Sequence, residues 1–219
     1  MDRAWRFLCK KTGSVYINQN ISLPLLSKEQ FIKEFTDGIT NKTKIIFLSH
    51  ITSPTALIFP IKEICDIARS KGIITIIDGA HVPAQIKLDI SEINPDYYSG
   101  ACHKWMCSPK GVAFLYVKKD LQKQIEPLVI SWGYEAENPG HSQFLDYLQW
   151  QGTNDISAYL SVVDTIKFLK KYNWNKITEK CKKMNLWAKE KILYELNLPK
   201  MSNNIFIGQM SSIFFPFEN

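Results

Sequence analysis

Two residues that could carry out chemistry together, Lys104 and Asp78, are each expected just after a buried strand. Lys104 lies in the segment YYSGACHKWMCSPKG (residues 97–111), next to Trp105 and Met106. Apolar surroundings disfavour a charged ammonium, so this segment predicts a desolvated amine that can attack carbonyl groups. Asp78 directly follows an isoleucine-rich run, which places it at the sheet edge where open α/β sheets bind ligands.

An amine and a carboxylate in this arrangement fit pyridoxal phosphate chemistry. In enzymes that use this cofactor, a lysine holds it through a Schiff base and an acidic residue pairs with its pyridinium nitrogen. We therefore predict pyridoxal 5′-phosphate as the cofactor, Lys104 as the catalytic amine and Asp78 as the partner of the ring nitrogen. The structural alternative is that Asp78 is a turn or helix-capping residue, which is the commoner role of an aspartate in that position.

The pair Gly152-Thr153 is a candidate phosphate site. It precedes a predicted helix that Asp155 is well placed to cap. Helix amino termini offer unpaired N–H groups and a favourable dipole to anions. Taken by itself, the pair is more simply explained as an ordinary helix cap.

Buried strands and helices alternate around these residues. Continuous apolar runs predict strands at 44–49, 73–77, 97–98 and 112–117. The helix between the first two strands has Pro60 in its first turn and Gly72 just past its end, and a short helical stretch near Ile90 follows the second strand. This alternation predicts an α/β fold, with a mainly parallel sheet flanked by crossover helices.

The two ends of the chain add further predicted elements. A strand is expected at 15–19, and a helix begins at Ser27, where Gln30 completes a capping box. From Ile156 the apolar residues follow a helical period through two successive helices. A last strand is expected at 211–215, as the start of a smaller second domain.

The composition is that of an ordinary globular protein, with 219 residues, 45% of them hydrophobic and 22% charged. A net charge of +6 could indicate nucleic acid or an acidic membrane as a partner. We expect neither, because many lysines lie on the polar side of one late helix without interleaved aromatic residues. The five cysteines form no CxxC pair and no zinc-ligand spacing, so no metal site is expected. With no apolar leader and no membrane-length apolar run, we expect a cytoplasmic protein.

Four motifs resemble the class V aminotransferase family of fold-type I pyridoxal phosphate enzymes, most closely its isopenicillin N epimerase-like branch. They are His50-Ile-Thr-Ser-Pro-Thr55 followed by Pro60, Asp78-Gly-Ala-His-Val-Pro83, the segment 97–111, and Gln149-Trp-Gln-Gly-Thr153. They follow the family's order and span most of the chain. The resemblance implies a fold-type I large domain and an amino-acid substrate.

The resemblance also assigns roles around the cofactor ring. Asp78 would keep the ring nitrogen protonated, since an opposite charge within about 4–6 Å favours the charged form. His81 would lie beside the ring and its phenolic oxygen, and Ser53 would make a polar contact to the ring or substrate. Lys104 would carry the Cα proton of the substrate as general base and acid.

The phosphate of the cofactor has its own predicted contacts in the family. His103 would contact it within the same chain. Gly152 and Thr153 would reach the phosphate of the neighbouring subunit, so the resemblance implies a homodimer with a shared active site.

The sequence departs from the family in two motifs and at both ends. Ala101 replaces the Ser or Asn of many relatives, so one hydrogen bond to the cofactor is expected to be missing, and Asn154 stands where the epimerase-like branch often has Arg. Family members also carry an amino-terminal phosphate-binding segment and a carboxyl-terminal domain whose arginine clamps the substrate. We therefore expect a fragment, with a cofactor-binding large domain at 1–173 and an interdomain helix and truncated small domain at 174–219.

Two hypotheses of different class follow. The first is an enzyme that acts on an amino acid by racemisation, transamination or lyase chemistry. The second is a non-catalytic truncated remnant that retains the fold. Within the first class, a cysteine desulfurase-like lyase is the second candidate, and its nucleophilic cysteine is expected on a later loop than this chain contains.

Overall fold

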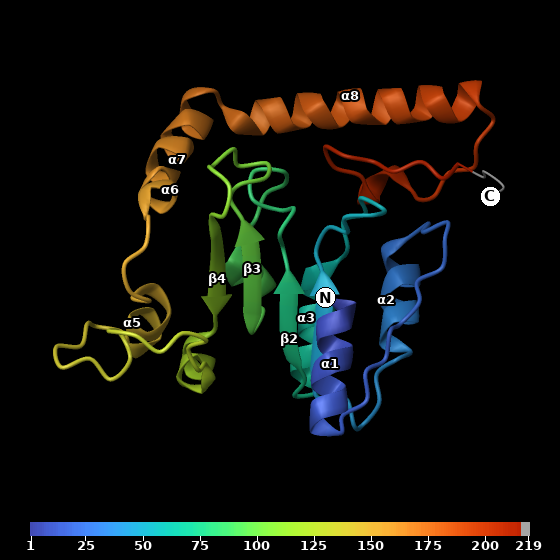
Figure 1. Cartoon of the computed structure of the whole chain (residues 1–219). Helices are drawn as coiled ribbons and strands as arrows, with labels where there is room; N and C mark the ends of the chain where they lie inside the picture. The colour runs from blue at the N-terminus through green and yellow to red at the C-terminus, as the bar shows by residue number, and fades with distance from the viewer. Residues whose placement is uncertain (216–219) are drawn as a thin grey trace.

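A four-stranded sheet forms the centre of the computed structural model, which describes residues 1–215 (Figure 1). Its strands, in spatial order, are β1 (Ile45–Ser49), β2 (Ile74–Asp78), β3 (Tyr97–Ala101) and β4 (Ala113–Val117). The first three are parallel and β4 runs antiparallel to β3. The predicted α/β fold with a mainly parallel sheet is therefore confirmed.

Short crossovers connect the parallel strands. Helix α3 (Ile61–Ser70) joins β1 to β2, with Pro60 as its N-cap, and α4 (Ile90–Ile93) joins β2 to β3. The chain leaves α3 through Gly72, whose φ of 65° lies in the left-handed region that glycine adopts at low cost. The chain passes from strand to helix and back where the sequence predicts it.

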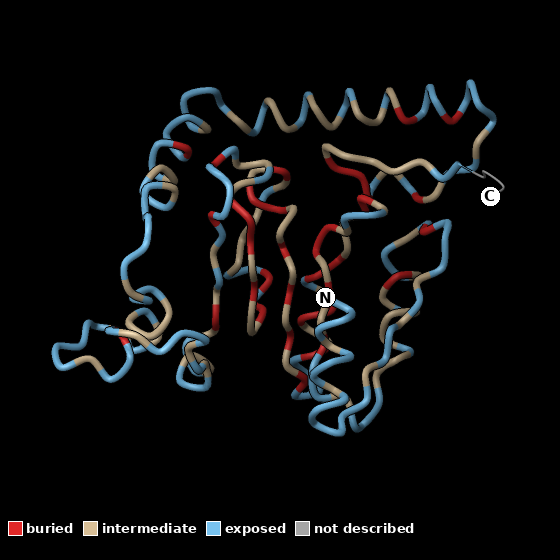
Figure 2. Tube along the Cα trace, viewed as in Figure 1, coloured by how far each residue is buried: buried red, intermediate tan, exposed pale blue. Residues whose placement is uncertain are grey.

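The core lies on one face of the sheet. Leu48, Ile77 and Tyr98 share one row across β1, β2 and β3, and all three are buried. Helices α3 and α2 (Lys28–Thr36) contribute further core residues, including Phe31. Figure 2 shows the buried residues concentrated in the strands and the adjoining chain. Because side chains alternate along a strand, the other face carries Phe47 and Asp78.

Helix α2 begins where its cap predicts. The Ser27 hydroxyl accepts the Gln30 amide N–H at 3.1 Å. The side chain of Gln30 reaches back one residue further than in a standard capping box, because it accepts the amide N–H of Leu26 at 2.8 Å.

The strand predicted at 15–19 is wrong. Helix α1 (Asp2–Thr12) precedes this segment and places Trp5 against Phe47, with ring centroids 5.6 Å apart. Residues 14–20 then continue without regular structure, and Val15 is 84% exposed. An apolar alternation forms a strand only where a neighbour accepts its backbone hydrogen bonds, and this segment pairs with no described strand.

The second half of the chain is mostly helical. Its elements are η1 (Lys119–Gln124), α5 (Gln143–Gln149), α6 (Ser157–Leu160), α7 (Val162–Lys171), α8 (Trp174–Glu195) and η2 (Asn204–Phe206). Helix α8 crosses above the carboxyl edge of the sheet in Figure 1, where the Trp174 indole N–H donates to the Ala84 carbonyl at 2.9 Å. In the described range, no helix is long and apolar enough to span a membrane.

Two predictions for this half need correction. The first helix after Ile156 is divided at Ser161 into α6 and α7. Residues 211–215 form no strand, because they lie beside no described strand with which they could pair. The rest of the small-domain prediction, 216–219, lies outside the described residues.

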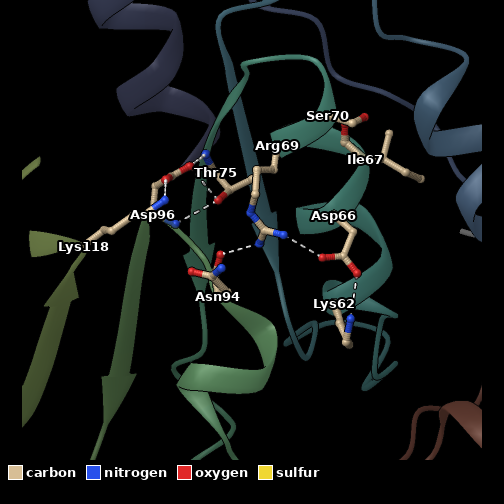
Figure 3. Close-up of polar contacts among 9 residues, drawn as sticks. All are labelled: Lys62, Asp66, Ile67, Arg69, Ser70, Thr75, Asn94, Asp96 and Lys118. Atoms are coloured by element: carbon tan, nitrogen blue, oxygen red, sulfur yellow. Dashed lines mark hydrogen bonds and ion pairs between the residues drawn. The ribbon is translucent and has the colours of Figure 1, made fainter. Parts of the chain in front are cut away.

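Polar contacts fix the strands at the opposite, amino-terminal edge of the sheet (Figure 3). The amide and hydroxyl of Thr75 both donate to Asp96 Oδ2, at 2.9 and 3.1 Å, and the Asp96 amide donates back to the Thr75 hydroxyl at 3.0 Å. Lys118 Nζ lies 3.8 Å from the other Asp96 oxygen. These contacts connect β2 to the start of β3 and the end of β4 at the amino-terminal edge of the parallel strands, away from Asp78.

Candidate active site

Asp78 is the last residue of β2, at the carboxyl edge of the parallel strands. It pairs in register with Ser49 of β1 and Ser99 of β3. One carboxylate oxygen, Oδ1, accepts the Ala80 amide N–H at 2.9 Å. Among the described residues no group donates to Oδ2, which leaves that oxygen for a ligand.

Lys104 lies in the loop between β3 and β4 and reaches the residue that follows the Asp78 turn. Its Nζ is 3.0 Å from Nε2 of His81. Asp78, His81 and Lys104 thus come from two adjacent strand ends, as the sequence predicts.

The predicted desolvation of Lys104 is wrong, because the Lys104 side chain is exposed. Trp105 and Met106 are half-buried and do not enclose the amine. Apolar neighbours in the sequence shield a side chain only when the loop folds them over it, and this loop presents Lys104 at the open edge of the sheet.

Trp105 has a different role, which the sequence analysis missed. Its indole N–H donates to Nδ1 of His81 at 3.3 Å. Since an indole N–H can only donate, Nδ1 is the acceptor and a neutral His81 carries its proton on Nε2, facing Lys104.

The protonation of His81 follows from its surroundings. Burial lowers the pKa of His81, the positive charge of a protonated Lys104 lowers it further, and the Asp78 carboxylate raises it in part. The lowered pKa keeps His81 neutral near pH 7, as the hydrogen bond from Trp105 requires.

His103 precedes Lys104 and is fixed by the backbone. Its Nδ1 lies 2.9 Å from the carbonyl oxygen of Val112, to which it can only donate. Nε2 is then the nitrogen that could face a phosphate, and it donates there when the ring is protonated.

Ser53 lies at the same edge, in the exposed turn after β1. The turn is held below it by the hydroxyls of Thr52 and Thr55, which are 2.6 Å apart. Ser53 is therefore placed where a ligand at the carboxyl edge could meet it.

Gly152 and Thr153 are not brought to Lys104 within one chain. Figure 1 shows their segment, between α5 and α6, beyond β4 and away from the loop after β3. Asp155 does accept the Ser157 amide at 2.8 Å, but α6 has only four residues and its dipole is correspondingly small. The phosphate role predicted for this pair is therefore not met within one chain.

A hollow lies elsewhere in the described chain. It has a volume of about 650 Å³ and is lined by residues around α5, among them Trp132, Tyr134 and Trp150. It is open and includes none of the predicted site residues. The chemical groups, and not this hollow, define the candidate site.

A family comparison agrees with the site. Residues 4–205 match the family model described as Aminotransferase class-V. The chain belongs to the class V aminotransferase family. This is a family of pyridoxal phosphate-dependent enzymes.

Relatives in this family have more than one activity. The chain is 32% identical over 198 residues to isopenicillin N epimerase from Amycolatopsis lactamdurans, covering 86% of this chain and 50% of that protein. It is 30% identical over 171 residues to putative L-cysteine desulfhydrase 1 from Oryza sativa subsp. japonica, covering 74% of this chain and 34% of that protein. The chain thus spans half or less of these relatives' length.

Solved structures agree on the fold. The apo structure of a cysteine desulfurase from Thermococcus onnurineus NA1 superposes with a TM-score of 0.78 at 18% identity, covering 97% of this chain and 53% of that one. At this identity the likeness shows the fold alone, which is the fold-type I architecture predicted from the sequence.

The residues present fit the family's cofactor. An accessible amine (Lys104), a carboxylate with one unused oxygen (Asp78) and a neutral imidazole (His81) surround one sheet edge. These are the groups that an aldehyde, a pyridinium nitrogen and a ring hydroxyl require.

Proposed function

We propose that this chain is the cofactor-binding part of an enzyme that acts on an amino acid through pyridoxal 5′-phosphate held covalently by Lys104. The observation that carries the proposal is the 3.0 Å contact between Lys104 Nζ and His81 Nε2 beside the Asp78 turn. Membership of the class V family supports the same cofactor.

Each side chain has a defined task. When bound, the cofactor acts as an electron sink that stabilises negative charge at the substrate Cα. Asp78 keeps a proton on the ring nitrogen through an ionic hydrogen bond. His81 orients the amine of Lys104 and offers a neutral N–H beside the ring oxygen. Lys104 would move the Cα proton as general base and acid.

The phosphate is bound by groups from two chains in this proposal. His103, fixed by the Val112 carbonyl, holds it from the chain that supplies Lys104. Gly152 and Thr153 hold it from the partner in a homodimer. Their position beyond β4 supports this division, because they lie away from Lys104 of their own chain.

Epimerase-type chemistry is the preferred reaction and lyase chemistry the second candidate. The 32% identity to an isopenicillin N epimerase over 86% of this chain favours removal and return of the Cα proton. The identity to a putative L-cysteine desulfhydrase supports the lyase alternative. A remnant that retains the fold without turnover is the third hypothesis.

Exchange of the Cα proton distinguishes these hypotheses. The protein, saturated with pyridoxal phosphate, is incubated with single amino acids in deuterated water, and deuterium at Cα and release of sulfide from L-cysteine are both measured. Epimerase-type chemistry predicts Cα deuteration without sulfide, and it is contradicted by sulfide release at a comparable rate. Lys104→Ala is the control and should show neither product. If the parent protein also shows neither, the result supports the hypothesis of a non-catalytic remnant.

A further inference from the structure

His50 and Tyr98 form a buried hydrogen-bonded pair directly behind Asp78. Nδ1 of His50 lies 2.9 Å from the Tyr98 hydroxyl, and the two side chains come from the end of β1 and the middle of β3. Burial lowers the pKa of His50 to about 4. Burial, together with the charge of Asp78, raises the pKa of Tyr98 above its usual range. Both groups are therefore neutral at pH 7, and each meets the hydrogen-bonding need of the other.

Both residues also contact the backbone at Asp78. The His50 amide N–H donates to the Asp78 carbonyl oxygen at 2.8 Å. The Tyr98 ring fills the space beside Gly79, where an added Cβ would overlap the ring and its hydroxyl. These contacts form a closed circuit around the Asp78–Gly79 turn. The His50 amide binds the Asp78 carbonyl, and the next residue, Gly79, packs against the Tyr98 ring. The Tyr98 hydroxyl then hydrogen-bonds to the His50 side chain.

The circuit approaches Asp78 from behind. Tyr98 shares the core row with Ile77, whereas the Asp78 side chain points to the other face of the sheet. Neither His50 nor Tyr98 is thus placed to touch a ligand at Asp78, and any effect on it passes through the backbone.

We propose that His50 and Tyr98 are positioning residues that hold the Asp78–Gly79 turn, and with it the Asp78 carboxylate, in the geometry needed by the cofactor's ring nitrogen. This inference rests on the proposed function of Asp78. It adds two residues outside the cofactor site, and it explains why the residue after Asp78 has no side chain.

The Ala80 amide gives a test that needs no cofactor. Its N–H donates to Asp78 Oδ1, so its hydrogen exchange in the protein without cofactor reports whether that carboxylate stays in place. Tyr98→Phe removes the hydroxyl, and His50→Gln moves the polar group away from the Nδ1 position. His50→Asn keeps an amide near that position and serves as the conservative rescue. Thr75→Val loses a buried hydroxyl at the opposite end of β2 and controls for stability alone.

The proposal predicts faster Ala80 exchange in Tyr98→Phe and His50→Gln, and roughly 3- to 10-fold weaker pyridoxal phosphate binding, the loss expected for one hydrogen bond. His50→Asn should fall within about twofold of the parent on both measures, and Thr75→Val should change Ala80 exchange by no more than its global stability requires. Equal exchange in Tyr98→Phe, His50→Gln and Thr75→Val, or no rescue by His50→Asn, would overturn it. If the parent failed to bind the cofactor, the proposed function would fall, and the exchange result would still decide whether the pair holds Asp78.

Discussion

At the scale of single residues, the site depends on which groups donate and which accept the hydrogen bonds around His81. The sequence predicted that Lys104 and Asp78 lie at one edge of the sheet, because residues that follow parallel strands meet there. His81 was predicted only through the family resemblance. The part played by Trp105 could not be predicted, since it depends on the direction in which the indole turns. The prediction that Lys104 is desolvated was wrong for a related reason, because the residue types in a loop do not fix how the loop folds.

Trp105→Phe tests the hydrogen bond that orders His81. The phenyl ring keeps the apolar bulk and loses the N–H donor, so both His81 tautomers become accessible. We expect the reaction of Lys104 with pyridoxal phosphate to slow by roughly 3- to 10-fold, the value of one hydrogen bond. Stopped-flow absorbance measures this rate, and Trp187→Phe, on the exposed side of α8, is the matched control. Equal rates in both variants would refute the role of Trp105.

Asp78→Asn tests the charge beside the ring nitrogen. The amide keeps the shape of the side chain and an oxygen for the Ala80 N–H, but it lacks the negative charge. A hydrogen bond to a charged group is worth about 1.5–3 kcal/mol, so cofactor affinity should fall by roughly 10- to 150-fold. Equilibrium titration of cofactor absorbance measures it, with Asp66→Asn as a control from the exposed ion pairs of α3. An unchanged affinity would separate Asp78 from the cofactor.

At the scale of elements, apolar runs predicted β1 to β4. Burial nevertheless alternates along β1 and β2, because the core lies on one face of the sheet. Pattern alone failed at 15–19 and 211–215, where no described strand lies alongside. The row of Leu48, Ile77 and Tyr98 then brings His50 behind the Asp78 turn. This placement came from strand register, which the sequence does not fix.

His50 should make the stability of the fold depend on pH. Its pKa is about 4 when folded and near 6.5 when unfolded, so between these values the unfolded chain binds the extra proton. Stability contributed by the neutral imidazole is therefore complete above pH 6.5 and is lost as the pH falls toward 4. The difference between pH 7.5 and 4.5 should be about 2–3 kcal/mol. Urea unfolding at both values measures it, and His50→Asn, which cannot titrate, should show a drop smaller by that amount. The same drop in both proteins would rule out His50 as the source.

At the scale of the whole molecule, the segment from Lys118 to Tyr172 has many apolar residues, but few of its residues are buried. Gly133 and Thr165 are the buried residues of this described segment, whereas Leu128, Trp132 and Trp150 are more than 60% exposed. One contact holds this segment to the rest of the chain: the Ser108 hydroxyl donates to the Thr165 hydroxyl at 3.2 Å, which connects α7 to the loop that carries Lys104. Apolar exposure of this extent is typical of surfaces that another polypeptide covers. The division into a large domain at 1–173 and a truncated small domain at 174–219 remains a prediction.

Subunit mixing tests whether the phosphate site is shared between chains. Lys104→Ala removes the amine, and Gly152→Asp places a negative charge where the phosphate should bind. In a homodimer with shared sites, a 1:1 mixture forms hybrids with one intact site each, so covalent cofactor incorporation should recover to roughly a quarter of all sites. Mass spectrometry of the reduced mixture measures it against each variant alone. A mixture that gives only the average of the two variants would exclude sharing.

The central claim, that Lys104 holds pyridoxal phosphate, is tested most directly by trapping. The protein is incubated with the cofactor, reduced with borohydride and digested, and the labelled peptide is mapped. The account predicts a yellow protein before reduction, one dominant adduct on Lys104, and loss of that adduct in Lys104→Arg. An adduct on another lysine, or labels spread evenly over the surface lysines in both proteins, would contradict it.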